Sequence, residues 1–288
     1  MSGPVPVIRT LAALRRQVRD WRARGDTVGL IPTMGALHEG HLELVRIAKA
    51  RCSRAVTSIF VNPAQFAPHE DFARYPRDEA GDLAKLARVG CDGVWSPDVA
   101  LMYPPDFATR IVPAGAAQGL ETDFRPHFFG GVATVCCKLF TQVQPDIAVF
   151  GEKDYQQLMV IRQLVRDLDL PLEIVPAETL READGLAMSS RNAYLTPEQR
   201  QTAALLNRVI RDVAAAARDG GILAGALASG RRQLEEAGFK VDYLEVRNAE
   251  TLEPPLPGAP LRVLVAAWLG KTRLIDNMGV EPGARPGM

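Results

Sequence analysis

Hydrophobic patterning alternates between strand-like and helix-like segments over the first 178 residues, and this alternation limits the possible folds most strongly. The predicted strands are residues 27–32, 55–61, 146–150 and 172–175, and the predicted helices are residues 10–24, 41–51, 78–89, 131–143 and 155–168. Strands separated by helices of about 10 to 15 residues indicate βαβ units. Because βαβ crossovers are right-handed, we expect an α/β fold with a Rossmann-like, doubly wound parallel sheet.

The pattern changes after about residue 180. Thr196 can cap a helix and Pro197 suits its first position, so a long helix is predicted from there to about residue 218. Gly220 and Gly221 break it, and a second helix follows at 223–236. Strand-like segments at 241–247, 261–268 and 272–275 then predict a smaller, largely antiparallel α+β unit, with a frayed tail at 281–288. We therefore expect two domains, 1–178 and 179–288.

Composition excludes several classes of partner. The 288-residue chain has 34 Lys plus Arg against 34 Asp plus Glu, so its formal net charge is zero. Nucleic-acid binders usually show a basic excess, so no nucleic-acid partner is expected. No run of about 18 apolar residues occurs, so no membrane span is expected. The four cysteines form no C-x-x-C pair and no secretory signal is visible, which predicts reduced thiols and a cytoplasmic protein.

The segment PTMGALHEGH (32–41) lies between a predicted strand and a predicted helix. Ligands of open parallel sheets bind outside the carboxyl ends of the strands, where helix N-termini attract phosphates. His38 and His41 could donate to a triphosphate there, with Gly40 allowing close approach. An ordinary turn with two histidines is one alternative. A zinc site is another, but these histidines are three residues apart rather than four and lack a third ligand nearby.

Three further segments offer polar side chains, although each alone could be an ordinary turn or linker. Lys153 and Asp154 follow the strand 146–150, where the lysine suits a phosphate and the aspartate a ribose or a metal. MSSRN (188–192) provides two hydroxyls and a guanidinium for a mobile phosphate clamp. Amides at Asn62, Gln65, Gln156 and Gln157 could hold a small polar substrate.

Taken together, these segments resemble the pantoate–β-alanine ligase family of the HxGH nucleotidyltransferase superfamily. The matching motifs are PTMGALHEGH (32–41), IFVNPAQF (59–66), GEKDYQQL (151–158), MSSRNAYL (188–195) and TRLIDN (272–277). They occur in one order over nearly the whole chain, to about Gly279. This makes the resemblance far more specific than H-x-G-H alone.

The resemblance implies ATP-dependent condensation of (R)-pantoate with β-alanine to pantothenate through a pantoyl adenylate, releasing pyrophosphate and AMP. Domain 1–178 would bind nucleotide and pantoate, and domain 179–288 would act as a lid. The catalytic positions are His38, His41, Lys153 and Arg191, with His38 as the usual general acid. The ATP-binding positions are Met34, Gly35, Ala36, Leu37, His38, Glu39, Gly40, His41, Gly151, Glu152, Lys153, Asp154, Leu180, Met188, Ser189, Ser190 and Arg191. Gln65 and Gln157 would hold pantoate, and Gln65 would also lie at the β-alanine site.

The resemblance further implies Mg²⁺ with ATP, mostly through phosphate oxygens and water, and a homodimer. Asp82 matches one acidic position near the metal, whereas Gly81 replaces its acidic neighbour. RPHFFGG (125–131) also departs from the family form R-P-G-H-F-R-G, with Phe128 in place of histidine and Gly130 in place of arginine. A sister nucleotidyltransferase acting on a phosphate ester and a non-catalytic nucleotide-binding protein are the alternative functions. The two glutamines disfavour the first, and intact His38 and Lys153 disfavour the second.

Overall fold

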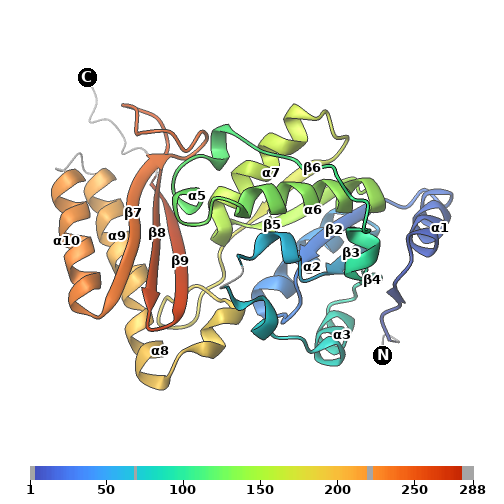
Figure 1. The fold of residues 1–288 in the computed structure, drawn as a ribbon, viewed down its shortest axis with the longest axis horizontal. Coiled ribbons are helices and arrows are strands. Elements are labelled where there is room, and N and C mark those ends of the chain that lie inside the picture. The colour runs from blue at the N-terminus through green and yellow to red at the C-terminus, as the bar shows by residue number, and fades with distance from the viewer. Residues whose placement is uncertain (1–3, 68–69, 219–222, 281–288) are drawn as a thin grey trace. The chain divides into compact units, whose positions relative to one another are not determined.

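A computed structural model describes residues 4–67, 70–218 and 223–280 of the chain (Figure 1). The chain forms two compact units. The first comprises the residues up to Glu152 together with Val160–Glu178, and the second comprises Lys153–Met159 together with the residues from Thr179 onward. The main division of the chain lies between Glu178 and Thr179. Whether the second unit acts as a lid stays a prediction.

The first unit is built on one parallel sheet of six strands, which confirms the predicted fold class. Its strands are β1 (Val7–Ile8), β2 (Val28–Thr33), β3 (Arg54–Ile59), β4 (Gly93–Trp95), β5 (Ile147–Gly151) and β6 (Glu173–Ala177). Their spatial order is β1-β4-β3-β2-β5-β6. The chain therefore moves outward from β2 through β3 to β4 and then returns to place β5 on the other side of β2. Ligands of open α/β sheets bind at such a reversal of strand order.

Helices cover both faces of this sheet. The longer ones are α1 (Leu11–Arg22), α2 (Glu39–Arg51), α3 (Glu79–Arg88), α6 (Phe128–Val143) and α7 (Tyr155–Asp167), and the short ones are α4 (Val99–Met102) and α5 (Glu121–Phe124). Leu30 and Ile31 of β2 point to opposite faces, and both are fully buried. A β-carbon at Gly29 would lie 3.0 Å from Ala48 Cβ of α2, so glycine lets the helix approach closely. Burial on both faces is typical of parallel sheets.

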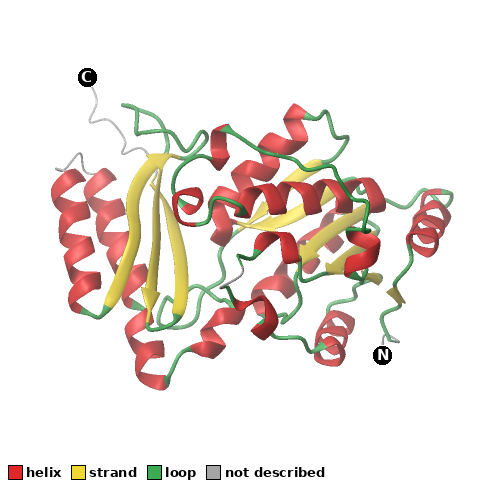
Figure 2. Ribbon diagram, viewed as in Figure 1, coloured by secondary structure: helices red, strands yellow, loops and turns green. Residues whose placement is uncertain are grey.

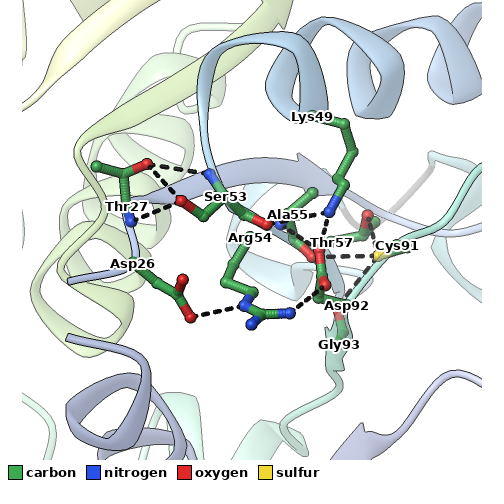
Figure 3. Close-up of polar contacts among 10 residues, drawn as sticks. All are labelled: Asp26, Thr27, Lys49, Ser53, Arg54, Ala55, Thr57, Cys91, Asp92 and Gly93. Atoms are coloured by element: carbon green, nitrogen blue, oxygen red, sulfur yellow. Dashed lines mark hydrogen bonds and ion pairs between the residues drawn. The ribbon is translucent and has the colours of Figure 1, made fainter. Parts of the chain in front are cut away.

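A network of charges joins the amino ends of β2, β3 and β4 (Figure 3). Arg54, the first residue of β3, donates through Nε to Asp26 Oδ2 at 2.8 Å and through Nη1 to Asp92 Oδ1 at 3.2 Å. Lys49 of α2 donates to Asp92 Oδ2 at 2.7 Å. Nearby, burial raises the pKa of the Cys91 thiol, which contacts Thr57 Oγ1 at 3.4 Å. Because these charges neutralise one another and the thiol stays protonated, the network is structural.

The second unit contains an antiparallel sheet packed against helices (Figure 2). Its strands are β7 (Phe239–Asn248), β8 (Leu261–Leu269) and β9 (Thr272–Val280), and its helices are α8 (Pro197–Ala203), α9 (Leu205–Arg218) and α10 (Leu223–Glu236). Gly230 of α10 approaches α9 so closely that a β-carbon there would lie 2.8 Å from Val209 Cγ1. This arrangement confirms the predicted smaller α+β unit.

The helix predicted to begin at Thr196 does so, but it is not continuous. Thr196 Oγ1 accepts the Gln199 backbone N–H at 3.2 Å, and Gln199 Oε1 accepts that of Thr196 at 3.1 Å. The prediction of one helix to residue 218 is wrong, because hydrogen bonding changes at Ala204 between α8 and α9. Ala204 keeps helical angles, φ −62° and ψ −18°, so no glycine or proline marks the break in the sequence. The predicted break at 220–221 and the tail at 281–288 lie outside the described residues.

Candidate active site

The loop between β2 and α2, residues 34–38, begins at the carboxyl end of a central strand. Thr33 Oγ1 donates to Ser58 O of β3 at 2.7 Å and accepts the Gly35 N–H at 3.3 Å. Gly35 and Ala36 both have positive φ, 84° and 52°. Leu37 is 3% exposed and packs in the core under the loop. A left-handed alanine is uncommon and needs surrounding structure to hold it, so this loop is fixed by its contacts.

Helix α3 supplies those contacts. Asp82 Oδ2 accepts the Ala36 N–H and Asp82 Oδ1 accepts the Leu37 N–H, each at 2.8 Å. Lys85 Nζ donates to Leu37 O at 2.7 Å. The N–H groups of Ala36 and Leu37 thus donate inside the protein, and any contact of these residues with ATP would use other atoms.

The motif histidines lie at the start of α2, next to this loop. His38 occupies the N-cap, and its backbone N–H donates to His41 Nδ1 at 3.3 Å. The ring centroids are 4.1 Å apart, with the planes tilted by 44°. Since Nδ1 of His41 is an acceptor here, the neutral ring carries its proton on Nε2 and presents a donor. Glu39, another predicted ATP position, forms an ion pair with Arg46 on the same helix.

Metal binding by these histidines finds no support in the geometry. Across residues 4–67, 70–218 and 223–280, no group of three or more His, Cys, Asp or Glu side chains could hold a metal ion. The contacts of His38 and His41 instead suit a paired donor site for an anion.

A second candidate position, Gln65, lies in a short 3-10 helix (Pro63–Gln65) after β3 and is 7% exposed. Asn62 Nδ2 donates to Gln65 Oε1 at 2.8 Å and to Gly131 O at 3.1 Å. Asn62 Oδ1 accepts from Ala64 N at 3.2 Å and from Tyr103 Oη at 2.8 Å. These four bonds use the full capacity of the Asn62 amide. Asn62 therefore orients the Gln65 side chain, and with Oε1 turned toward Asn62, the Nε2 group is the donor that we expect a substrate to contact.

We expect Asn62→Asp to reverse this orientation. A carboxylate oxygen would face Gln65 Oε1 and Gly131 O, so the Gln65 amide would turn and present its oxygen. The expected result is about a tenfold rise in the KM for pantoate, corresponding to one lost hydrogen bond to a charged group. Steady-state kinetics with pantoate as the varied substrate measure it.

Tyr103→Phe is the matched control for Asn62→Asp. It removes one bond to Asn62 but leaves the donor to Gln65 in place, so the KM for pantoate is expected to change by less than about threefold, a neutral hydrogen bond being the weaker kind. Burial raises the pKa of Tyr103 to about 12, so its hydroxyl remains a donor over the whole assay range. An unchanged KM in Asn62→Asp would contradict the orienting role.

In the segment 125–131, where the sequence departs from the family form, Phe128 contacts Arg125. Arg125 donates to Glu70 through Nε at 2.8 Å and through Nη2 at 2.6 Å, and Nη2 also donates to Gln65 O at 3.1 Å. Burial opposes ionisation of Glu70, but the bonds and charge of Arg125 outweigh it and lower its pKa. Phe128 places its ring 3.9 Å from Arg125 Cζ. The replacement thus supports an arginine that holds the backbone of Gln65.

The GEKD segment begins at the carboxyl end of β5, the strand beside β2. Gly151 ends β5 and Glu152 begins a short 3-10 helix (Glu152–Asp154). Lys153 and Asp154 belong to the second unit, where Asn277 Nδ2 of β9 donates to Lys153 O at 2.8 Å. Arg262 Nε donates to Asn277 Oδ1 at 2.8 Å and fixes that amide. The TRLIDN motif therefore holds the backbone of the candidate lysine.

The third candidate loop is also tied to β9. Arg181 donates to both carboxylate oxygens of Asp276, at 2.7 and 3.0 Å. The backbone N–H of Met188 donates to Leu180 O at 2.9 Å. Ser189 Oγ accepts the Arg191 N–H at 3.3 Å and caps a 3-10 helix, Ser190–Tyr194.

The structure thus groups the candidate residues within each unit. The first unit holds His38, His41 and Gln65, and the second holds Lys153, Asp154, Gln157, Leu180 and the 188–191 loop. The supporting roles of Lys85, Asn277 and Arg262 were not predicted from the sequence, and Asp82 was predicted only as a metal position. The Asp-Asn pair in TRLIDN was the one available signal for Asn277.

Comparison with known proteins identifies the family. The family model for pantoate–β-alanine ligase matches residues 6–279. Pantothenate synthetase of Rhodopseudomonas palustris (strain HaA2) is 57% identical over 283 residues, covering 97% of this chain and 100% of the relative. The crystal structure of pantothenate synthetase from Thermus thermophilus has a TM-score of 0.89 and 46% identity, covering 96% of this chain and 100% of that one. Pantoate–β-alanine ligase from Francisella tularensis has a TM-score of 0.82 and 32% identity, covering 97% and 99%.

These matches confirm the predicted resemblance and the prediction of an amide-forming ligase. They cover nearly the whole length of both this chain and its relatives, so the assignment rests on both units. The chain belongs to the pantoate–β-alanine ligase family.

Proposed function

We propose that this chain condenses (R)-pantoate with β-alanine through a pantoyl adenylate, with ATP bound at the carboxyl edge of the parallel sheet. The observation that carries the proposal is the position of two motif loops. Residues 34–41 follow β2, and Gly151 and Glu152 lie at the end of β5; β2 and β5 pair where the strand order reverses. The Francisella relative was crystallised with β-γ ATP and β-alanine, which supports the same ligands here.

In the first proposed step, a carboxylate oxygen of pantoate attacks the α-phosphorus of ATP. A P–O bond forms, the bond to the β-phosphate oxygen breaks, and pyrophosphate leaves. His38 and His41 would donate to phosphate oxygens from the N-terminus of α2, where the helix dipole also favours negative charge. Lys153 and Arg191 would add positive charge, and Ser190 would add a hydroxyl donor.

In the second proposed step, the amine of β-alanine attacks the acyl carbon of the adenylate. The C–N bond forms, the bond between the acyl carbon and the phosphate oxygen breaks, AMP leaves with the electron pair, and one proton of the amine is released to water. Gln65 would hold both pantoate and β-alanine, and Gln157 would hold pantoate. No covalent bond to the protein is needed, because the adenylate is itself the activated species.

Magnesium fits this site only as a partner of ATP. Both oxygens of Asp82 accept backbone N–H groups, and the side chain is 1% exposed. Gly81, at the second family acid, has no carboxylate, and a β-carbon there would lie 2.0 Å from Asp78 Oδ2. We propose that Mg²⁺ is held by ATP oxygens and water, the usual arrangement for this ion.

The assembly and compartment are also proposals. We propose a homodimer acting in the cytoplasm, on the strength of the family resemblance. None of the described helices is long and apolar enough to cross a membrane. Light scattering coupled to size exclusion measures the assembly directly, and a mass of one chain would contradict the dimer.

The proposed function is tested by following pyrophosphate and AMP separately, with ATP, Mg²⁺ and pantoate, in the presence and absence of β-alanine. We expect pyrophosphate with pantoate alone, and AMP with pantothenate only after β-alanine is added. ATP binding without pantoate-dependent pyrophosphate would contradict the proposal and indicate another acceptor or a binding protein. A phosphate ester that replaced pantoate would support the sister nucleotidyltransferase instead.

A further inference from the structure

Two side chains of helix α3 bind the backbone N–H and the backbone carbonyl of Leu37 in the 34–38 loop. The N–H of Leu37 donates to Asp82 Oδ1 at 2.8 Å, and its carbonyl accepts from Lys85 Nζ at 2.7 Å. Leu37 directly precedes His38, so its backbone sets where the N-cap of α2 begins. Asp82 and Lys85 lie three residues apart on one face of α3, and their charged atoms are 3.5 Å apart.

Asp82 also stabilises the unusual backbone beside Leu37. Its Oδ2 accepts the N–H of Ala36, whose φ is 52°, and it lies 3.2 Å from where a β-carbon of Gly35 would be. Gly35 and Ala36 both have positive φ, and the N–H groups of Ala36 and Leu37 point toward one anion, a geometry that suits a carboxylate or a phosphate. Here the anion is a carboxylate of the protein itself.

We propose that Asp82 and Lys85 are positioning residues for His38 and His41, and that Asp82 serves the loop rather than a metal ion. This inference rests on the proposed function, since it takes residues 34–41 as the ATP site. Because Asp82 and Lys85 hold the backbone of this loop, the two imidazoles are in place before ATP binds. Pre-organised donors of this kind raise the rate of the chemical step rather than the affinity for the ground state.

The test compares Asp82→Asn with Lys85→Met in pantoate-dependent pyrophosphate release. Asparagine has only one carbonyl oxygen, so its NH₂ group would face a buried N–H of Ala36 or Leu37. Methionine keeps most of the lysine stem but cannot donate to Leu37 O. We expect both variants to lower kcat about tenfold, because small misplacements of reacting groups carry large rate costs. The KM for pantoate should stay within about twofold, since ground-state binding is left intact.

Magnesium titration separates the two roles of Asp82. A positioning role predicts lower kcat in both variants, with the half-saturating Mg²⁺ concentration unchanged. A metal-ligand role predicts opposite effects, because Asp82→Asn would weaken Mg²⁺ binding whereas Lys85→Met would remove a repelling charge. Recovery of the Asp82→Asn rate at high Mg²⁺, or a normal rate in both variants, would overturn the inference.

Asp78→Asn is the matched control, four residues earlier at the cap of α3. Asp78 Oδ1 accepts the Gly81 N–H at 2.9 Å, and asparagine caps a helix equally well, so activity should not change.

A readout independent of activity is the NMR spectrum of the imidazole nitrogens, which is simple because the chain has four histidines. The His38 and His41 signals should shift in Asp82→Asn and Lys85→Met but not in Asp78→Asn.

These measurements distinguish failure of the inference from failure of the proposed function. Imidazole signals that do not move in folded Lys85→Met would overturn the positioning role even in an active enzyme. Wild-type protein without pantoate-dependent pyrophosphate would instead contradict the proposed function, while the NMR comparison would still decide what Asp82 and Lys85 do.

Discussion

Replacing His38 with alanine is expected to lower the rate of adenylate formation by about 10² or more while leaving the fold intact. His38 caps α2 at the carboxyl edge of the sheet, next to His41 and above the loop held by Asp82. In the proposed mechanism, removing the ring takes away a donor aimed at charge that develops in the transition state. Single-turnover release of pyrophosphate measures the chemical step without the second half-reaction.

Glu43→Gln is the control for His38→Ala, on the same helix. Among the described residues, the interaction of Glu43 is a surface ion pair with Arg46, of the kind worth little to stability. The rate of pyrophosphate release by the Glu43→Gln variant should match that of the wild-type protein. Near-normal pyrophosphate release in a folded His38→Ala protein would show that the ring has no part in the first step.

Replacing Gly131 with alanine is expected to lower the free energy of unfolding by about 3 kcal/mol, at the upper end of overpacking costs. A β-carbon at Gly131 would lie 2.3 Å from Ala64 O and 2.6 Å from Ala64 C. Both are backbone atoms, so no side chain can turn away. Relief would require moving the 3-10 helix that carries Gln65, so binding of pantoate should be lost together with stability.

Gly130→Ala provides a control one residue away in the same helix. A β-carbon there would come no closer than 3.5 Å to Ile111 O, an ordinary contact. Alanine is the better helix former, so this variant should be neutral or more stable by up to about 1 kcal/mol. Urea unfolding of both variants makes the comparison, and equal stability of the two would refute the packing argument.

Much of the fold could be predicted because the long elements have clear periodicity. The helix start at Thr196 and strands β2, β3, β5 and β6 follow directly from hydrophobic patterning and capping residues. β1 and β4 were missed, because strands of two and three residues are too short to show alternation. The break at Ala204 was missed because Ala204 keeps helical angles and no glycine or proline marks it in the sequence.

The candidate site could be predicted where its residues lie in a recognisable motif. It was harder to predict where a residue only positions another residue. His38 and His41 stand out by their spacing at a strand-to-helix junction. Asn277 and Lys85 do not, because a side chain that binds a backbone atom far away in the sequence leaves no local pattern. Asp82 shows the same limit, since its sequence position suggested a metal whereas its oxygens meet two N–H groups.

Because of the charge network at the amino ends of β2, β3 and β4, the stability of this enzyme can be changed independently of its catalytic rate. Six residues of β2 place Asp26 and Arg54 about 20 Å from the 34–38 loop at the other end of the same strands. Changes separated by more than about 10 Å usually act additively. Substitutions that strengthen the interactions at this edge should therefore raise the melting temperature without altering turnover. The edge is thus a place where the protein can be stabilised for use as a biocatalyst.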